Sequence, residues 1–174
     1  MRTDSPTIAY LALGANLGDR AGALAAAAAM LDSAGGVRVM ARSPMYETDA
    51  VADEPQPPYL NAVLRVETTL GPRELLAACL EVERVLGRVR VPGQRHASRT
   101  IDVDVLLCAG AVLSVAGLDV PHPQLAARPF VRIPLADVAE PGLRHPISGE
   151  PLDVAGPSPS VRRTSELWTE RKVH

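Results

Sequence analysis

The stretch Arg99-Thr100-Ile101-Asp102-Val103-Asp104-Val105-Leu106-Leu107 decides how the chain folds. It predicts a β-strand, because three of its residues are aliphatic and β-branched and no Gly or Pro follows until Gly110. Side chains alternate along a strand, so Asp102 and Asp104 face one side while the aliphatic residues face the other and pack into a core. Asp is unfavourable in strands, and two carboxylates about 7 Å apart on one face repel each other unless a cation lies near them.

The paired aspartates indicate a metal site. Mg²⁺ prefers oxygen ligands and needs only one or two carboxylates when substrate phosphates complete its coordination. Arg99, at the start of the strand, adds a planar guanidinium suited to phosphate. The alternative is a half-exposed strand with two aspartates on its solvent face, because an Asp-x-Asp pattern alone is a weak motif.

The segment that leads into this strand, residues 88–99, is strongly basic. It contains four arginines and one histidine and no acidic residue. Such a run repels itself unless it is solvated or paired with an anion, so a solvated loop remains one reading. Beside a metal-binding strand, it is also what a polyphosphate site requires, with arginines on the phosphate oxygens and metal ions bridging them.

Outside this strand, hydrophobic periodicity and turn residues predict an alternating order of strands and helices. Strands are expected at 7–13, 37–47, 59–68 and 99–107, and helices at 20–31 and 72–86. The order β-α-β-β-α-β predicts an α+β fold of the ferredoxin-like (split β-α-β) type, in which helices pack on one face of an antiparallel sheet. The other face, with the two aspartates, would be open to a ligand.

The rest of the chain predicts a small C-terminal extension. Short elements are expected as a strand at 112–115 and helical turns within 124–133 and 135–138, and residues 139–160 are rich in loop formers. We expect one domain over residues 1–160 and a tail over residues 161–174, either helical or disordered.

Composition limits the function classes. The net charge of −2 argues against nucleic-acid binding through bulk electrostatics. Cys79 and Cys108 are the only cysteines, and no signal-peptide core is recognisable, so we expect a reducing cytoplasm. The longest apolar run, Ala23 to Leu31, is nine residues and too short to span a membrane. We expect a monomer with small-molecule partners.

Several motifs together resemble the 6-hydroxymethyl-7,8-dihydropterin pyrophosphokinase family of folate biosynthesis, over about residues 8–152. Their order and spacing match that family. The motifs are Leu13-Gly14-Ala15-Asn16-Leu17-Gly18-Asp19, Tyr46-Glu47-Thr48, Tyr59-Leu60-Asn61-Ala62, Gly87-Arg88-Val89-Arg90, Arg99-Thr100-Ile101-Asp102-Val103-Asp104, Val120-Pro121-His122-Pro123 and Arg128-Pro129-Phe130-Val131.

The resemblance implies transfer of pyrophosphate from ATP to the hydroxymethyl group of the pterin, with release of AMP. It implies that Asp102 and Asp104 bind two Mg²⁺ ions and act in catalysis with Arg88, Arg90 and Arg99. The pterin would be held by Thr48, Tyr59, Asn61 and Phe130, with Tyr59 and Phe130 on its two ring faces. ATP would be held by Glu83, Arg88, Arg90, Arg99, His122 and Arg128.

The chain departs from the common pattern of this family at Leu80, His96, Gly117 and Asp119. The resemblance associates these positions with a loop that closes over the site and with contacts to the nucleotide, and none of them belongs to the aspartate pair. Two other function classes stay open at this point. One is a metal-dependent phosphodiesterase that uses the same carboxylates and water, and the other is a non-catalytic ferredoxin-like binding module.

Overall fold

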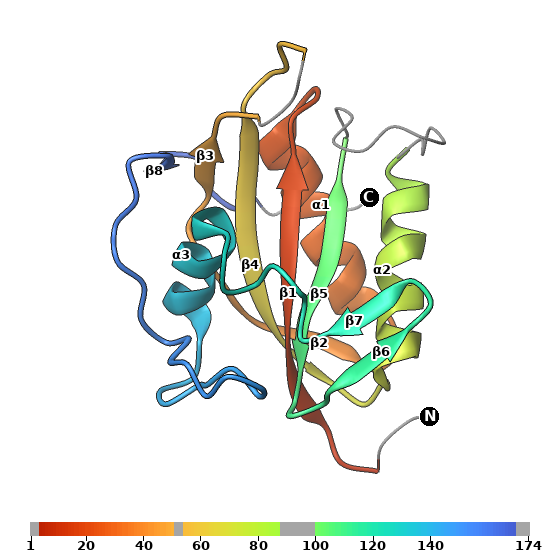
Figure 1. The fold of residues 1–174 in the computed structure, drawn as a ribbon. Coiled ribbons are helices and arrows are strands. Elements are labelled where there is room, and N and C mark those ends of the chain that lie inside the picture. Colours follow the sequence, from red (N-terminus) through yellow and green to blue (C-terminus); the bar gives the residue numbers. More distant parts are fainter. Residues whose placement is uncertain (1–3, 51–53, 88–99, 170–174) are drawn as a thin grey trace.

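The computed structural model describes residues 4–50, 54–87 and 100–169. Its elements in chain order are β1 (Thr7–Ala15), α1 (Arg20–Ser33), β2 (Val37–Arg42), β3 (Tyr46–Thr48), β4 (Tyr59–Thr68), α2 (Pro72–Val85), β5 (Asp102–Cys108), β6 (Leu113–Val115), β7 (Leu118–Val120), α3 (Pro129–Val138) and β8 (Val161–Arg163). Figure 1 shows a central sheet with helices on both sides.

Six of the strands form one sheet, in the order β5-β1-β4-β3-β8, and β2 pairs with β4 next to β3. Every pairing in this sheet among the described residues is antiparallel. β6 and β7 form a separate hairpin, which contacts β5 and α2. The mixed α/β architecture with an antiparallel sheet is therefore confirmed.

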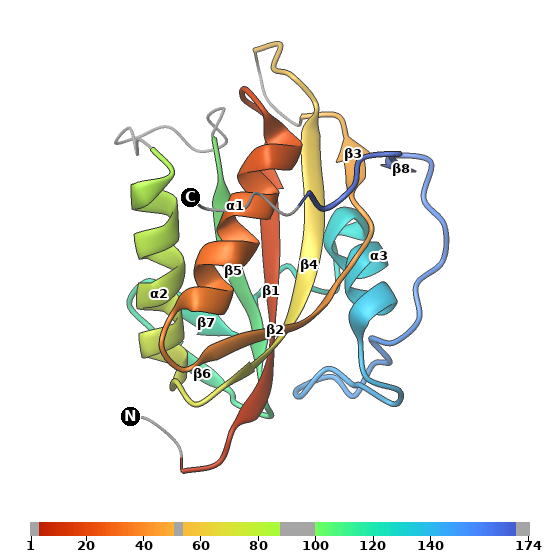
Figure 2. The ribbon, with the colours of Figure 1, turned by 180° about the vertical axis from the view of Figure 1, so that it is seen from behind.

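The two faces of the sheet carry different apolar clusters. On one face, α1 and α2 pack against β1, β4 and β5, and the buried residues include Leu11, Leu64 and Val103. On the opposite face, α3 packs mainly against β4, and its cluster includes Val63 and Leu106. Figure 2 shows α1 and α2 in front of the sheet and α3 beyond it. The expectation of one open face is thus wrong in part, because α3 covers some of the face that was expected to be open.

Local sequence explains where the two long helices begin. Asp19 caps α1, because its Oδ1 accepts a hydrogen bond from the backbone N–H of Gly22 at 2.9 Å. α2 has Pro72 at its first position, and Oε2 of Glu74 accepts from the backbone N–H of Gly71 at 3.0 Å. Both caps satisfy backbone donors that a helix start leaves without intrahelical partners.

The prediction of a single strand at 37–47 is wrong, because the structure has two strands there, β2 and β3. The backbone N–H of Ser43 donates to the carbonyl of Val63 at 2.9 Å, and the N–H of Val63 donates to Oγ of Ser43 at 2.9 Å. A side-chain oxygen thus replaces a backbone acceptor, and Pro44 has no N–H to continue the ladder. The chain consequently leaves β2 and re-enters the sheet as β3.

Both cysteines lie in the core and are free thiols. Burial, followed by the negative charges of Glu83 and Asp104, raises the pKa of Cys79 to about 12. Burial also raises the pKa of Cys108. Since the thiolate is the reactive form, both cysteines are structural apolar residues at neutral pH. In the described part of the chain, no helix has the length and apolar character needed to cross a membrane.

A hydrogen bond joins β3 to α3 across the second face. The hydroxyl of Tyr46 donates to Oδ2 of Asp137 at 2.5 Å, and Tyr46 is 7% exposed. Burial and this hydrogen bond raise the pKa of Tyr46 from 10.0 to about 12. Because the folded state holds the phenol proton more tightly than the unfolded state, the resulting stability is complete below pH 10 and is lost as the pH rises to about 12.

Replacing this phenol is expected to destabilise the fold. Tyr46→Phe should lower the free energy of unfolding by about 1–2 kcal/mol at pH 7, because it removes a charge-assisted hydrogen bond. Urea denaturation measures this change, and Asp137→Asn is the matched control, since asparagine keeps an acceptor and should cost less. Between pH 10 and 12 the wild type should lose more stability than Tyr46→Phe. Equal pH profiles for the two proteins would contradict the assignment.

Candidate active site

One row of residues crosses the sheet on the face that carries α3. Asp102 of β5 lies opposite Gly14 of β1, Gly14 lies opposite Asn61 of β4, and Asn61 lies opposite Tyr46 of β3. Asp104 belongs to the next row, opposite Ala12. Strand pairing therefore brings the aspartate pair and Asn61 to one side of the sheet, although about 40 residues separate them in the sequence.

A cavity of about 470 Å³ opens over these rows, a volume typical of small-molecule sites. It lies between the sheet, the start of α3 and the segment that follows β7. Eight residues predicted from the sequence line it: Thr48, Tyr59, Asn61, Asp102, Asp104, His122, Arg128 and Phe130. The structure thus brings together residues from five separate segments of the chain.

Small residues form the floor of the cavity. Gly14 lies between Asp102 and Asn61, and a Cβ atom at this position would be 3.4 Å from Oδ1 of Asn61. Ala12 lines the cavity in the row beside it. The strand predicted at residues 7–13 ends before Gly14, so this role of Gly14 was not predicted. The signal was present in the i, i+2 spacing of Ala12 and Gly14, which places both on one face.

At one end of the cavity, a polar pair lies near two aromatic rings. The amide Nδ2 of Asn61 donates to Oγ1 of Thr48 at 3.0 Å, and both residues are buried. Tyr59 and Phe130 line the same cavity and are half-buried. The guanidinium carbon of Arg128 lies 5.6 Å from the centre of the Phe130 ring. An apolar slot with a few oriented polar groups suits a flat heteroaromatic molecule.

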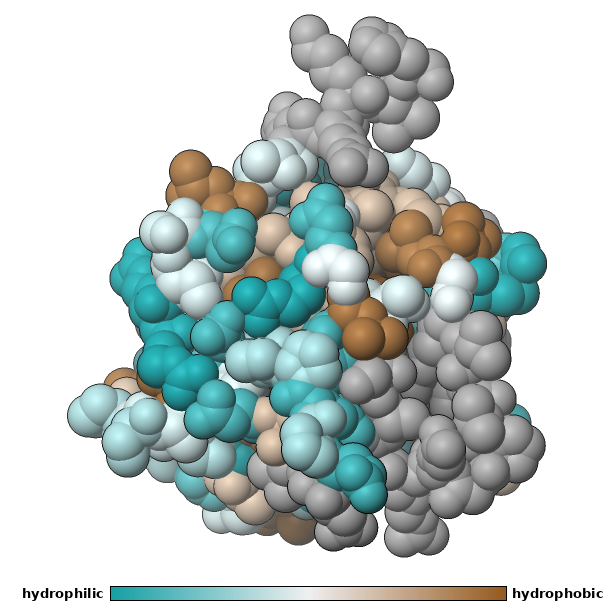
Figure 3. Space-filling view, turned by 90° about the horizontal axis from the view of Figure 1, so that it is seen from above, coloured by the Kyte–Doolittle hydropathy of each residue, from teal (hydrophilic) through white to brown (hydrophobic). Residues whose placement is uncertain are grey.

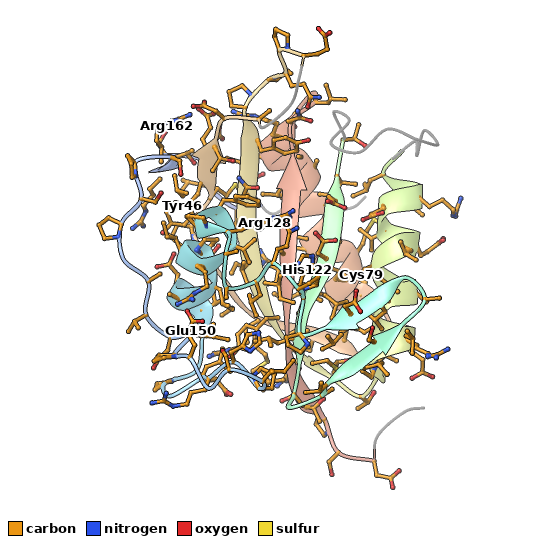
Figure 4. The ribbon with its side chains drawn as sticks, in the orientation of Figure 1. Tyr46, Cys79, His122, Arg128, Glu150 and Arg162 are labelled. Carbon is orange, nitrogen blue, oxygen red and sulfur yellow. The ribbon has the colours of Figure 1, made fainter. Side chains whose placement is uncertain are left out.

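Near the aspartates, His122 and Arg128 supply nitrogen donors. Burial lowers the pKa of His122, and the positive charge of Arg128 lowers it further, although Asp102 and Asp119 oppose this shift. Nδ1 of His122 accepts from the backbone N–H of Gln124 at 3.2 Å, so the neutral ring carries its proton on Nε2. Figure 4 labels both residues, which lie on the side of the sheet that carries α3. His122 therefore offers a neutral donor and Arg128 a cationic one.

The aspartate pair fits a hard cation that shares its ligands with a substrate. Both carboxylates line the cavity. Among the described residues, no group of three or more His, Cys, Asp or Glu side chains can hold a metal ion by itself. This donor set suits Mg²⁺, which keeps water and phosphate oxygens in its coordination shell, better than Zn²⁺, which takes three or four protein ligands.

Glu83 does not line the cavity. It is 3% exposed, and its Oε1 accepts from the backbone N–H of Val103, between the two aspartates, at 2.9 Å. Glu83 thus fixes the backbone of β5 from the side that carries α2. Its expected contact with ATP stays a prediction. Its position, four residues after Cys79 on the buried stripe of α2, was the signal for an inward direction.

Side chains that follow β1 hydrogen-bond to the chain just before β4, at the edge of the cavity. Nδ2 of Asn16 donates to the carbonyl of Pro57 at 3.1 Å, and Nη1 of Arg20 donates to the carbonyl of Pro58 at 2.9 Å. These bonds hold the chain that enters β4 at Tyr59. At this end of the molecule the visible described surface is largely hydrophilic, and its apolar residues form separate small groups (Figure 3).

Several predicted site residues lie outside the described part of the chain, and two residues that line the cavity were not predicted. Arg88, Arg90 and Arg99, which were expected to bind phosphate, lie outside the described residues, as does His96. Asp49 and Ser160 line the cavity and were not expected to do so. Asp49 lies between the strands expected at 37–47 and 59–68, where no role was predicted, and Ser160 lies in a region whose composition indicates loop structure alone.

The family model and the curated relatives that match this chain carry the same activity in their names. A family model described as 7,8-dihydro-6-hydroxymethylpterin-pyrophosphokinase (HPPK) matches residues 10–140. A protein of Methylorubrum extorquens named 2-amino-4-hydroxy-6-hydroxymethyldihydropteridine pyrophosphokinase is 45% identical over 133 residues, which are 76% of this chain and 83% of the relative. A protein of the same name from Bacillus subtilis is 41% identical, over 76% of this chain and 78% of the relative.

Longer proteins are also similar. The folic acid synthesis protein fol1 of Schizosaccharomyces pombe is 38% identical over 96% of this chain, but the match covers 23% of fol1. Among solved structures, a Plasmodium falciparum HPPK-DHPS crystallised with pterin and p-hydrobenzoate has a TM-score of 0.65 at 14% identity. It covers 88% of this chain, which spans 44% of that longer protein, and it supports the fold alone.

Proposed function

The chain belongs to the 7,8-dihydro-6-hydroxymethylpterin-pyrophosphokinase family, and from this premise we propose how its cavity works. The enzyme transfers pyrophosphate from ATP to the hydroxymethyl group of 6-hydroxymethyl-7,8-dihydropterin in folate biosynthesis and releases AMP. The observation that carries the proposal is that the residues expected to bind the pterin and those expected to bind metal line one cavity.

The end of the cavity at Asn61 and Thr48 is the proposed pterin site. Tyr59 and Phe130 would stack on the two faces of the ring, and each such contact is worth about 1–3 kcal/mol with a heteroaromatic base. Asn61 would hydrogen-bond the polar edge of the ring, with Thr48 completing that recognition. The 3.0 Å hydrogen bond between Asn61 and Thr48 supports this assignment, because it holds the amide in one orientation.

The end at β5 is the proposed site for the triphosphate. Asp102 and Asp104 would hold two Mg²⁺ ions, which supply charge neutralisation on the triphosphate when bound. His122 and Arg128 would donate to phosphate or nucleotide oxygens. Arg88, Arg90 and Arg99 complete the proposal from the sequence, as the cationic partners of the phosphates.

The protein's own contribution to the reaction is orientation. The pterin ring, held between the aromatics, would direct its hydroxymethyl oxygen along the floor at Gly14 towards β5. There the β-phosphorus of ATP would be presented for in-line attack, and the leaving group would be AMP. Glu83 supports this arrangement through its hydrogen bond to the backbone between the two aspartates.

Some finer descriptions remain proposals. The order β5-β1-β4-β2 with α1 and α2 on one face supports a ferredoxin-like classification of the sheet. A monomer, a cytoplasmic location and a domain over residues 1–160 are proposed from the sequence alone. The tail expected after residue 160 is neither helical nor disordered at its start, because Val161–Arg163 form β8 in the main sheet.

Equilibrium binding tests whether the cavity takes the pterin at one end beside the nucleotide at the other. Calorimetry with 6-hydroxymethyl-7,8-dihydropterin, Mg²⁺ and a non-hydrolysable α,β-methylene ATP analogue should show one pterin bound per chain. A phosphodiesterase on the same carboxylates would bind the nucleotide and release no heat with the pterin. Absence of pterin binding at millimolar concentration would therefore reject the proposed function.

A further inference from the structure

The C-terminal segment, residues 158–168, forms part of the wall of the active site. Within it, β8 pairs with β3, and Val161 lies opposite Thr48 while Arg162 lies opposite Glu47. Ser160 lines the cavity. The family match ends at residue 140, so this wall comes from outside the matched residues.

Arg162 links two acidic side chains beside the cavity. Its Nη2 lies 3.0 Å from Oδ1 of Asp49 and 3.4 Å from Oε1 of Glu47, and its Nη1 lies 3.5 Å from Oδ2 of Asp49. Asp49 itself lines the cavity, directly after Thr48. Figure 4 shows Arg162 next to β3. The guanidinium therefore contacts both residues that flank Thr48.

A second arginine extends this network to the opposite side of the rim. Nη2 of Arg20 lies 2.9 Å from Oε2 of Glu47, and the same guanidinium donates to the carbonyl of Pro58. The chain of contacts thus runs from Asp49 through Arg162, Glu47 and Arg20 to the residue before Tyr59. It connects the proposed polar and aromatic contacts of the pterin.

The C-terminal segment is attached along its length and not only at Arg162. The backbone N–H and Oγ1 of Thr164 both donate to the carbonyl of Met45, at 3.0 and 3.1 Å. Nε1 of Trp168 donates to the carbonyl of Ser43 at 2.7 Å, and Arg42 lies 5.6 Å over the indole ring. These contacts fix the register of β8 against β3 at the edge of the sheet. They thereby fix the position of Arg162 beside the cavity.

We propose that the C-terminal segment positions the pterin end of the active site, and that Arg162 is the positioning residue, acting through Asp49 and Glu47. This inference rests on the proposed function. Without the guanidinium, two carboxylates would flank Thr48 with one partner fewer, and they would repel each other and the substrate phosphates. Asp49 would then lose its ion pair with β8, while the aspartate pair on β5 would be unaffected.

Arg162→Ala is expected to raise the KM for the pterin about threefold to tenfold, within the range of a solvent-exposed ion-pair network. The KM for ATP and kcat should stay within about twofold of wild type, since Asp102 and Asp104 lie at the other end of the cavity. Arg162→Lys should recover part of the loss, because lysine keeps the charge but not the bidentate contact. Steady-state kinetics with each substrate varied in turn measures these values.

A double-variant cycle separates positioning from a general structural effect. If Arg162 acts through Asp49, the double variant Arg162→Ala/Asp49→Asn should bind the pterin no more weakly than the worse single variant. The matched control is Arg38→Ala, which removes an exposed arginine on β2 that pairs with Glu67 at 3.4 Å, away from the cavity. It should leave both KM values unchanged.

The inference is overturned if Arg162→Ala changes the pterin KM no more than Arg38→Ala does, or if its effects multiply fully with those of Asp49→Asn. An equal rise in both KM values would also overturn it. Failure of the proposed function has a different signature, because the wild-type protein would then neither bind nor turn over the pterin.

Discussion

Replacing Asp102 or Asp104 with asparagine is expected to lower kcat by about a thousandfold, which corresponds to about 4 kcal/mol of lost transition-state stabilisation. Asparagine keeps the shape of the side chain but not the charge that would bind Mg²⁺. Neither variant should lose stability, because both carboxylates line the cavity and not the core. Removing one of two like charges should leave the thermal midpoint unchanged or slightly higher.

The matched control is Asp153→Asn. Oδ2 of Asp153 accepts from the backbone N–H of Gly142 at 2.7 Å, and the residue does not line the cavity. It carries the same chemical change with no expected effect on the rate. Activity within threefold of wild type for Asp102→Asn or Asp104→Asn would disprove the metal assignment.

Replacing Phe130 with alanine is expected to raise the dissociation constant of the pterin by about 10–100-fold, since it removes one stacking partner of the ring. The dissociation constant of ATP should change little, apart from any shift of Arg128, which lies over the same ring. Calorimetry with each ligand gives both values.

Phe130 also packs against the cluster under α3, so loss of stacking must be separated from loss of packing. Phe130→Leu makes this separation, because leucine fills much of the same space but has no aromatic face. It should restore the thermal midpoint and leave most of the binding defect. If Phe130→Leu binds the pterin as tightly as wild type does, Phe130 is a packing residue and the sandwich is wrong.

Strand alternation was sufficient to predict the parts of the fold that position the site. β4 spans the predicted residues Tyr59–Thr68, and Asp102 and Asp104 share a face as expected. Both results follow from the two-residue period of a strand, which is a local property of the sequence. The resemblance to a family added expected roles for single residues, such as Phe130, that the strand period does not single out.

Elements that depend on tertiary partners were not predictable in the same way. α3 is one ten-residue helix with Pro134 inside it, although separate helical turns were predicted within 124–133 and 135–138. Burial of four residues against the sheet outweighs the lost backbone hydrogen bond. β8 has three residues in a Pro- and Ser-rich region, and only the edge of β3 makes it a strand. Its contribution to the cavity therefore has no local signal in the sequence.

The identity of the nucleotide product tests the proposed pyrophosphate transfer most directly. The protein, ATP, Mg²⁺ and 6-hydroxymethyl-7,8-dihydropterin are incubated together, and the phosphorus species are followed by ³¹P NMR. We expect one AMP for each pterin diphosphate formed, and no nucleotide consumption when the pterin is omitted. Formation of ADP, or of AMP without the pterin, would contradict the proposed transfer.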